Sequence, residues 1–229
     1  MLYTETVERT TLELLRHLEG EPELSQFALA GGTALALYLG HRVSVDLDLF
    51  SPFPFDAMDL KDFLEQTYGF RVDFMKKKNT LKGTINGVKV DCLTYEYDSV
   101  QDIHVEDGIR LYSLEDISAM KLSAIADNGT RLKDFIDVAC LSTRLSLYSM
   151  LKFYERKFPD TSVIRPLKAV TYFDDIDFNE NIVMLNGNYK WENIEKRLTD
   201  MTKNQDKIFN SFPLKIMRDD KKKSYYPHR

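Results

Sequence analysis

Two aspartates, Asp46 and Asp48, lie two residues apart in the stretch VDLDLF, which begins at Val45. In a β-strand, side chains two apart point to the same face, so the two carboxylates project together while the apolar residues, Val45 included, face the core. Paired carboxylates suit the divalent cations that accompany a nucleoside triphosphate. The spacing therefore predicts a site for one or two Mg²⁺ ions, with Mn²⁺ as an alternative.

A glycine pair, Gly31-Gly32, precedes these aspartates and is followed by a short helix that begins at Thr33. The first turn of a helix has unpaired backbone N–H groups, and glycine lets an anion approach them closely. Thr33 adds a hydroxyl, and Arg42 and Ser44 stand just before the acidic strand. We predict that these five residues bind the phosphates of a nucleotide. The alternative for Arg42 and Ser44 is that they stabilise the loop by hydrogen bonds.

Two charged residues occupy apolar stripes of adjoining predicted helices. Lys121 lies among the apolar residues of a helix over 114–127, and Asp134 lies among those of a helix over 132–145, with Asp137 at the margin. An unpaired buried ammonium is costly, so Lys121 either extends to solvent or reaches a fixed anion. Asp134 also fits the first turn of a helix, where the macrodipole favours an acid. Two such residues of opposite charge predict a shared polar site that faces the strand carboxylates.

Phosphoryl transfer gives each of these side chains a use. Lys121 would add a fixed positive charge to the phosphates. Asp134 would orient Lys121 or accept a proton from the attacking hydroxyl. A further carboxylate, Asp91, stands in the second strand of a hairpin whose turn is Asn86-Gly87. It either faces solvent or forms a third metal ligand beside Asp46 and Asp48.

Composition bounds the class of protein. The chain has 229 residues, 43% of them hydrophobic, and a net charge of −5, which argues against a nucleic-acid binder that uses its whole surface. Lys76–Lys78 and Lys221–Lys223 remain candidate phosphate contacts. Cys92 and Cys140 read as reduced core residues. No run approaches the roughly 18 apolar residues that span a bilayer, so we expect a cytoplasmic protein without a membrane partner.

Periodicity and turn signals divide the chain into an α/β part, 1–112, and an all-α part, 113–229. Ser113 to Asp116 has the form of a helix capping box, and it opens the second part. The predicted helices cover residues 4–19, 33–39, 56–68, 114–127, 132–145, 149–157, 163–173 and 191–209. The predicted strands cover 27–30, 45–50, 70–75, 80–85, 88–95 and 109–112.

The motifs over residues 27–141 resemble the nucleotidyltransferase superfamily related to DNA polymerase beta, and more closely the AbiEii/AbiGii toxin family. The first motif is GGT followed by GHRVSVDLDLF, at residues 31–33 and 40–50. The second is SLED leading to MKL, and then GTRLKDFID, ending at Asp137. The sequence departs from the family at Asp127-Asn128-Gly129, where an Arg-Gly pair is often found.

The resemblance implies an α+β fold, with a nucleotidyltransferase-like mixed sheet flanked by helices and followed by a helical C-terminal region that completes the active-site cleft. It implies that Ser44, Asp46, Lys121 and Asp134 form the functional set, and that Asp48 completes the DxD motif. It also implies an enzyme that transfers a nucleoside monophosphate from an NTP to the 3′ end of tRNA, as the toxin of an abortive-infection pair with a cognate antitoxin.

Two other functions stay open. The acceptor could be a protein hydroxyl or a small molecule, because related folds serve many acceptors. A catalytically inactive nucleotide-binding module is the third reading. The joint presence of Asp46, Asp48, Lys121 and Asp134 argues against this third reading, because a binder has no need for charges on apolar helix stripes.

Overall fold

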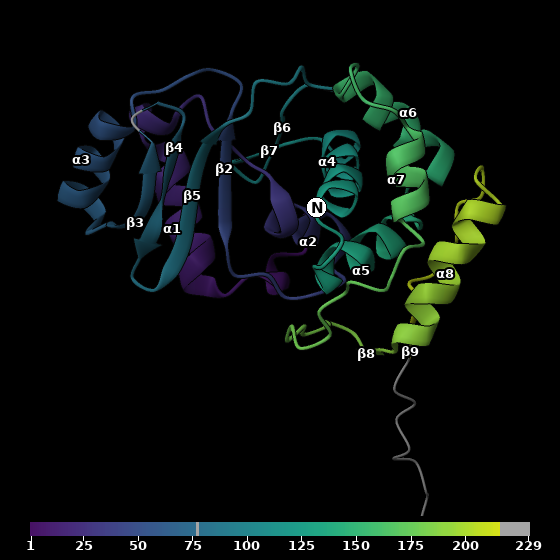
Figure 1. Ribbon diagram of the computed structural model, residues 1–229. Helices are drawn as coiled ribbons and strands as arrows, with labels where there is room; N and C mark the ends of the chain where they lie inside the picture. Colours follow the sequence, from purple (N-terminus) through teal and green to yellow (C-terminus); the bar gives the residue numbers. More distant parts are fainter. Residues whose placement is uncertain (77, 216–229) are drawn as a thin grey trace, which may run out of the picture.

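The computed structural model describes residues 1–76 and 78–215, and within them the strands form one seven-stranded mixed sheet and one two-stranded sheet (Figure 1). The strands are β1 (Ala28–Leu29), β2 (Leu47–Ser51), β3 (Arg71–Lys76), β4 (Thr80–Ile85), β5 (Val88–Thr94), β6 (His104–Glu106), β7 (Ile109–Leu111), β8 (Asn188–Tyr189) and β9 (Leu214–Lys215). The large sheet has the order β3-β4-β5-β2-β1-β7-β6. Strand pairs β2/β5 and β1/β7 are parallel, and the others are antiparallel.

Helices flank this sheet and then form a layer of their own. They are α1 (Arg9–Gly20), α2 (Gly31–Leu39), α3 (Ala57–Tyr68), α4 (Leu114–Asp127), α5 (Leu132–Leu141), α6 (Leu147–Lys157), α7 (Ile164–Ala169) and α8 (Trp191–Lys203). In Figure 1, α3 lies beside β3 and β4 at one end of the sheet, whereas α4 to α8 gather at the opposite side. Helix α1 packs against β7. Helix α4 packs against α2, α5, α6 and α7. This arrangement confirms the predicted α+β fold with a helical C-terminal region.

Several local signals act as the sequence predicts. Asp56 caps α3 by accepting a hydrogen bond from the Met58 N–H at 2.8 Å. Gly40 and Gly69, which follow α2 and α3, both adopt φ +66°, where a residue with a side chain would be strained. The Asn86-Gly87 turn joins β4 to β5 with both residues at positive φ, as a two-residue hairpin requires.

Tertiary hydrogen bonds shorten several predicted helices. The helix predicted over 4–19 breaks because the carbonyl of Thr6 accepts a hydrogen bond from the Ser44 N–H, and α1 begins only at Arg9. Helix α5 ends four residues early, because the Ser142 hydroxyl donates to the Ala139 carbonyl and accepts from Arg197 on α8. Helices α7 and α8 also end before their predicted limits, and the short strand β6 carries no signal that predicted it.

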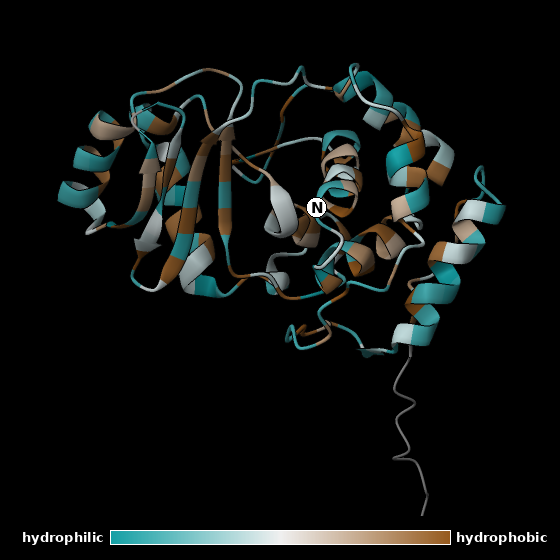
Figure 2. Ribbon diagram, in the orientation of Figure 1, coloured by the Kyte–Doolittle hydropathy of each residue, from teal (hydrophilic) through white to brown (hydrophobic). Residues whose placement is uncertain are grey.

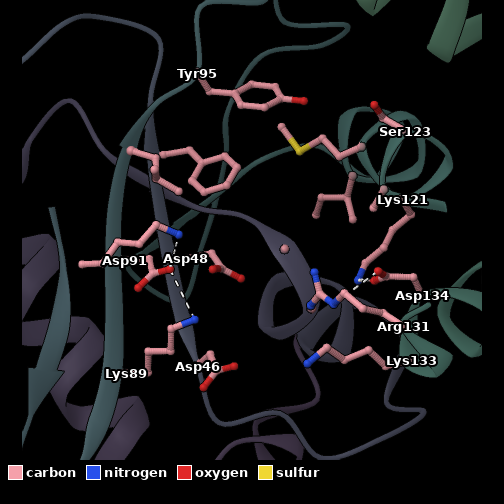
Figure 3. Close-up of a pocket in the computed structure, with 18 residues that line it drawn as sticks. Asp46, Asp48, Lys89, Asp91, Tyr95, Lys121, Ser123, Arg131, Lys133 and Asp134 are labelled. Carbon is pink, nitrogen blue, oxygen red and sulfur yellow. Dashed lines mark hydrogen bonds and ion pairs between the residues drawn. The ribbon is translucent and has the colours of Figure 1, made fainter. Parts of the chain in front are cut away.

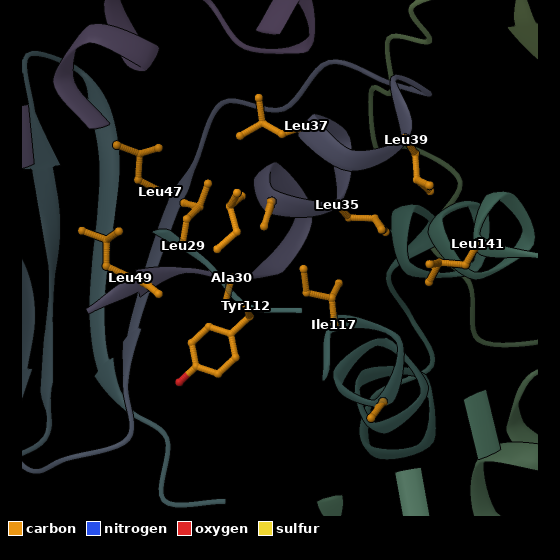
Figure 4. Close-up of a cluster of buried hydrophobic side chains, with 14 of the residues drawn as sticks. Leu29, Ala30, Leu35, Leu37, Leu39, Leu47, Leu49, Tyr112, Ile117 and Leu141 are labelled. Carbon is orange, nitrogen blue, oxygen red and sulfur yellow. The ribbon is translucent and has the colours of Figure 1, made fainter. Parts of the chain in front are cut away.

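Apolar side chains from both parts of the chain form one core cluster. Figure 4 shows leucines of β1, β2, α2 and α5 in one cluster with Ile117 of α4. Along β2, buried Leu47 and Leu49 alternate with partly exposed Asp48 and Phe50, and Figure 2 shows the alternation of hydrophobic and hydrophilic residues along the strands. Val45 is 56% exposed, contrary to the prediction, because β2 begins only at Leu47.

The capping box at the start of α4 has a second use. The Ser113 hydroxyl accepts from the Asp116 N–H at 3.0 Å, as predicted. The Asp116 carboxylate forms a buried ion pair with Lys157 of α6 at 2.6 Å and accepts the Val100 and Gln101 N–H groups. A buried carboxylate needs this many partners, so the pair ties α4 to α6 and to the loop before β6.

The division of the chain at residue 112 stays a prediction. Four of the six lysines predicted as phosphate contacts, Lys77 and Lys221–Lys223, lie outside the described residues. In the part of the chain that the structure describes, no helix combines the length and apolar character needed to cross a bilayer.

Glu19, at the end of α1, is a buried acid far from the predicted site residues in sequence. Its carboxylate accepts the Arg110 N–H at 2.6 Å, while its other oxygen has no hydrogen-bond partner within the described residues. Burial raises the pKa of Glu19 from its ordinary 4.5 to about 7, against the smaller opposing effect of the Arg110 hydrogen bond.

We predict that Glu19→Gln stabilises the protein above neutral pH. Between pH 4.5 and 7 the folded state keeps a proton that the unfolded chain releases, so wild-type stability falls as pH rises. Glutamine removes this loss, with a gain of up to about 3 kcal/mol at pH 8 and little gain near pH 4.5. Urea unfolding at both pH values measures it, with the exposed Glu13→Gln as control. An equal effect at both pH values would contradict the assignment.

Candidate active site

A cavity of about 590 Å³ lies between the large sheet and helices α4 and α5 (Figure 3). Its sheet wall carries acidic and basic side chains that face a second, mainly basic wall in Figure 3. The charged lining residues are Asp46, Asp48, Lys82, Lys89 and Asp91 on the sheet side, and Lys121, Arg131, Lys133 and Asp134 on the helix side. The predicted strand carboxylates, Lys121 and Asp134 therefore line one cavity.

Asp46 and Asp48 supply the accessible acidic side chains. Within the described residues, neither carboxylate has a recorded hydrogen bond or ion pair. Burial raises the pKa of Asp48, the Asp91 charge adds to this effect, and Asp46 adds a smaller part, against the opposing charges of Lys121 and Lys89. Carboxylates that repel one another in a partly buried site would be stabilised by a bound cation.

Asp91 faces the cavity, so the solvent-exposed alternative is wrong. It is 2% exposed and stands beside Asp48 in the parallel pairing of β5 with β2. Two lysines neutralise it: Lys82 Nζ is 2.8 Å and Lys89 Nζ 3.3 Å from its Oδ2. Its Oδ1 is buried without a partner in the described chain. A third ligand role for Asp91 stays a prediction.

The glycine pair makes room for two charged side chains. Gly31 has φ +67°, and a Cβ there would lie 2.2 Å from Asp48 Oδ2. A Cβ on Gly32 would lie 2.5 Å from Arg42 Nη2. The two glycines also line the cavity at the start of α2, whose N-cap residue Ala30 offers no side-chain acceptor. Glycine is therefore needed here to leave room for the protein's own charged side chains, and anion binding by this pair stays a prediction.

Thr33 and Ser44 fix the loop that leads into β2. The Thr33 hydroxyl donates to the Asp46 carbonyl, and its oxygen lies 2.9 Å from the Ser44 hydroxyl oxygen. Both residues border a recess of about 30 Å³ that also borders Gly32, Asp46, Asp48, Lys121 and Arg42. Thr33 and Ser44 thus position Asp46, and their predicted contact with a phosphate stays a prediction.

Lys121 reaches fixed anions and does not extend to solvent. Its Nζ lies 2.7 Å from Asp134 Oδ1 and 2.6 Å from Asp137 Oδ2. Burial by itself would lower the pKa of Lys121, but the charges of Asp137 and Asp134 outweigh it and raise that pKa. The ammonium therefore stays charged at neutral pH, with Asp134 and Lys121 both at the cavity wall.

Asp137, predicted at the margin of the apolar stripe of its helix, has several charged and polar partners beside the cavity. Arg42 donates to it through Nε at 2.7 Å and Nη2 at 3.0 Å, and His41 Nε2 lies 2.8 Å from it. Burial would raise the pKa of Asp137, but Arg42 and Lys121 bring it well below the usual range. Burial lowers the pKa of His41, so its ring is neutral. Arg42 therefore has the structural hydrogen-bonding role of its second predicted alternative, and its predicted contact with a phosphate stays a prediction.

The cavity is also lined by four cationic residues that were not predicted from the sequence. Arg131 Nε lies 3.6 Å from Asp134 Oδ2, and Lys133 pairs with Glu180 at 2.9 Å. Lys82 and Lys89 pair with Asp91. The pairing of Lys82 with Asp91 could have been predicted from the hairpin, because a two-residue turn at Asn86-Gly87 places residue 82 opposite residue 91. Lys133 carried no comparable signal, since its role depends on a distant loop.

The donor set fits a magnesium ion held partly by its substrate. Asp46 and Asp48 offer carboxylate oxygens that no group in the described part of the chain occupies, and Mg²⁺ is often held by one or two carboxylates together with substrate phosphates. Across residues 1–76 and 78–215, no three His, Cys, Asp or Glu side chains are close enough to hold a metal ion by themselves. Asp91 is paired with the ammonium groups of Lys82 and Lys89.

Comparison with known proteins supplies the family. Residues 13–211 match the family model of the nucleotidyl transferase AbiEii toxin of type IV toxin–antitoxin systems. An uncharacterised protein from Aquifex aeolicus is 31% identical over 157 residues, which cover 66% of this chain and 75% of the relative.

Among solved structures, protein JHP933 from Helicobacter pylori aligns with a TM-score of 0.49 and 18% identity, over 86% of this chain and 92% of that one. An antigenic nucleotidyltransferase-like protein from Paracoccidioides brasiliensis aligns with a TM-score of 0.45 and 19% identity, over 71% and 94%. The family assignment rests on the family model, which covers most of the sequence. The chain is therefore a nucleotidyltransferase that belongs to the AbiEii toxin family of type IV toxin–antitoxin systems.

Proposed function

We propose that this enzyme transfers a nucleoside monophosphate from an NTP to the 3′ end of tRNA, in a reaction that depends on Mg²⁺ or Mn²⁺. The observation that carries the proposal is that Asp46 and Asp48, two carboxylates with no partner within the described residues, share one cavity with the charged Lys121 and the start of α2. The family membership supports an antitoxin partner. We also propose an abortive-infection role in the cytoplasm.

The triphosphate belongs at the charged end of the cavity. The backbone N–H groups at Gly31 and Gly32 and the side chains of Lys121, Arg131 and Lys133 supply positive charge there. The base belongs at the apolar end, which is lined by Phe50, Leu93, Tyr95, Ile117, Met120 and Ala124. The rings of Phe50 and Tyr95 are already stacked, with centroids 5.2 Å apart, and so present an aromatic surface.

Asp46 and Asp48 would hold the metal ion, and Asp91 is the candidate for a third ligand. When bound, the ion neutralises phosphate charge that builds up on the leaving pyrophosphate. The carboxylates keep their geometry through their neighbours, because Thr33 fixes the Asp46 backbone and Gly31 leaves space for Asp48. Preorganisation of this kind lowers the cost of assembling the transition state.

In the reaction, the acceptor hydroxyl oxygen forms a bond to the α-phosphorus while the bond from that phosphorus to the β-phosphate oxygen breaks. Pyrophosphate carries away the bonding electron pair, and the hydroxyl proton passes to a base or to water. We assign Asp134 the orienting role, because it holds the Lys121 ammonium at 2.7 Å. Lys121 then stabilises negative charge on the phosphates.

The first prediction concerns the acceptor. The protein is incubated with Mg²⁺, each labelled NTP in turn, total cellular RNA and lysate protein, and tRNA is expected to gain the label. Asp46→Asn should abolish labelling. It should cost little stability, because it relieves repulsion between carboxylates. Label on protein or on a small molecule would replace RNA as the acceptor. Label on nothing would favour an inactive nucleotide-binding module.

A second prediction tests the contact between Gly31 and Asp48. Gly31→Ala should displace the Asp48 carboxylate and reduce kcat at least 100-fold. Gly69→Ala is the matched control, because Gly69 has nearly the same φ but a Cβ there would meet nothing within 4 Å. Both variants should lose about 1–2 kcal/mol of stability from the left-handed backbone. Equal activity of the two variants would show that the Asp48 position does not matter.

A third prediction separates the role of Lys121 in the reaction from its role in folding. Lys121→Met and Lys157→Met each remove a buried lysine from a buried aspartate, so each should cost about 3–5 kcal/mol of unfolding free energy. Only Lys121→Met should also raise KM for the NTP and lower kcat, measured at a temperature where both variants are folded. Normal kinetics for Lys121→Met would place Lys121 outside the reaction.

A further inference from the structure

The cavity face of the sheet continues beyond the cavity. Directly opposed residues on neighbouring strands share a face, and one row runs Asp48, Asp91, Lys82, Phe74 from β2 through β5 and β4 to β3. The row thus leads from the proposed metal ligand to the edge strand β3. Figure 1 shows that edge, where β3 lies far from α4 to α8.

Beyond β5 this face is open. Phe74 is 49% exposed, and the side chains of Lys82 and Lys89 are 35% and 50% exposed. The alternate residues of β4 and β5, such as Leu81 and Val90, are fully buried on the other face. One face of the β3–β5 hairpins therefore packs into the core, while the other carries an exposed aromatic ring beside charged side chains.

The exposed face is basic although the protein as a whole is acidic. The pairing of Arg71 with Thr84 and of Thr84 with Lys89 puts a second row on this face, and Lys76 lies opposite Thr80 in a third. Arg71 and Lys76 are exposed. The only acids in these rows are Asp48 and Asp91 at the cavity, while Asp73 occupies the bulge of β3. A net charge of −5 makes this concentration of cations a local feature.

We propose that this surface, made of Arg71, Phe74, Lys76, Lys82 and Lys89 and called here the sheet platform, binds the single-stranded 3′ end of the RNA acceptor and directs it into the cavity. The proposal rests on the proposed function, since it gives that RNA its path. A base would stack on the Phe74 ring, and the phosphates would contact the lysines and Arg71.

The chemistry of the platform favours single strands. Unpaired bases can stack on an aromatic side chain, whereas bases inside a duplex cannot reach one, and four-stranded sheets elsewhere bind two or three bases in this way. Strands lie about 4.8 Å apart, so the three steps from β2 to β3 span roughly 14 Å. That width suits a few nucleotides whose terminal hydroxyl would end near Asp48.

The test uses the full-length protein and a fluorescent single-stranded RNA of twelve nucleotides, with anisotropy measured over a series of salt concentrations. Phe74→Ala should weaken binding roughly 5-fold to 150-fold with no change in the salt dependence, because it removes stacking alone. Arg71→Ala/Lys76→Ala should reduce the slope of log K against log salt by about 1.4, the value for two phosphate contacts on a single strand. Affinity for the Mg²⁺–NTP should stay at the wild-type level in both.

Matched controls come from surfaces remote from the platform. Val105→Ala removes a 63% exposed apolar side chain from β6, at the other edge of the sheet, and Lys152→Ala/Arg156→Ala removes two exposed cations from α6. Both should bind RNA as the wild type does. A blunt RNA duplex should compete at least 10-fold less well than the single strand.

The outcomes separate this inference from the proposed function. If the enzyme labels RNA but the platform variants bind RNA like their controls, the platform is wrong and the transfer to RNA stands. If the duplex competed as well as the single strand, the proposed role of the sheet platform would also be wrong, because the RNA would then bind through charge alone. If only protein or small molecules gain label, the acceptor assignment fails and the platform fails with it.

Discussion

The geometry of the site depends on the ion pairs and hydrogen bonds of the buried Asp137 carboxylate. It joins three separate segments, because Arg42 and His41 come from the loop before β2, Lys121 comes from α4, and Asp137 itself belongs to α5. With Asp134 included, the cluster holds two carboxylates and two cations around a neutral His41, so the buried charges balance. Removing one member would leave an uncompensated charge in the interior, which is far more costly than keeping the set intact.

This cluster explains how a chemical site can be built between a sheet and a helical layer. Asp137 holds Lys121, which in turn pairs with Asp134. Asp46 and Asp48 are held by the sheet and by α2. The cavity between them is charged at one end and apolar at the other. Its shape and polarity therefore correspond to the two halves of a nucleotide, and the open strands β3 and β4 leave a route to it.

A second buried pair, between Asp116 and Lys157, fixes α4 from its other side. Lys157 also lies over the rings of Tyr95 and Tyr112, at 5.1 Å and 5.7 Å from their centroids. Tyr95 lines the apolar end of the cavity. The helix that carries Lys121 is thus anchored to α6 and to the loop before β6 through its N-terminal turn, and Lys157 connects this anchor to the aromatic end of the cavity.

The sequence alone determined the elements that follow local rules, and the residue types of the site. Some of these elements depend on only a few neighbouring residues, so the sequence predicts them directly. They are the glycines in the left-handed region, the Asp56 cap, the Asn86-Gly87 turn and the alternation in β2. The polar residues Lys121 and Asp134 were also recognisable, because charges on apolar helix stripes require partners. The tertiary structure decided which partners these are.

Only the folded chain reveals that Arg42 is bound to Asp137 and that Asp91 is neutralised by Lys82 and Lys89. It also reveals that a hydrogen bond from Ser44 shortens the helix predicted over 4–19, and that one from Arg197 shortens the helix predicted over 132–145. These interactions join residues far apart in sequence, and each depends on a competition between burial and charge pairing. Periodicity along one segment cannot report the outcome of that competition, because it contains no information on which distant group arrives.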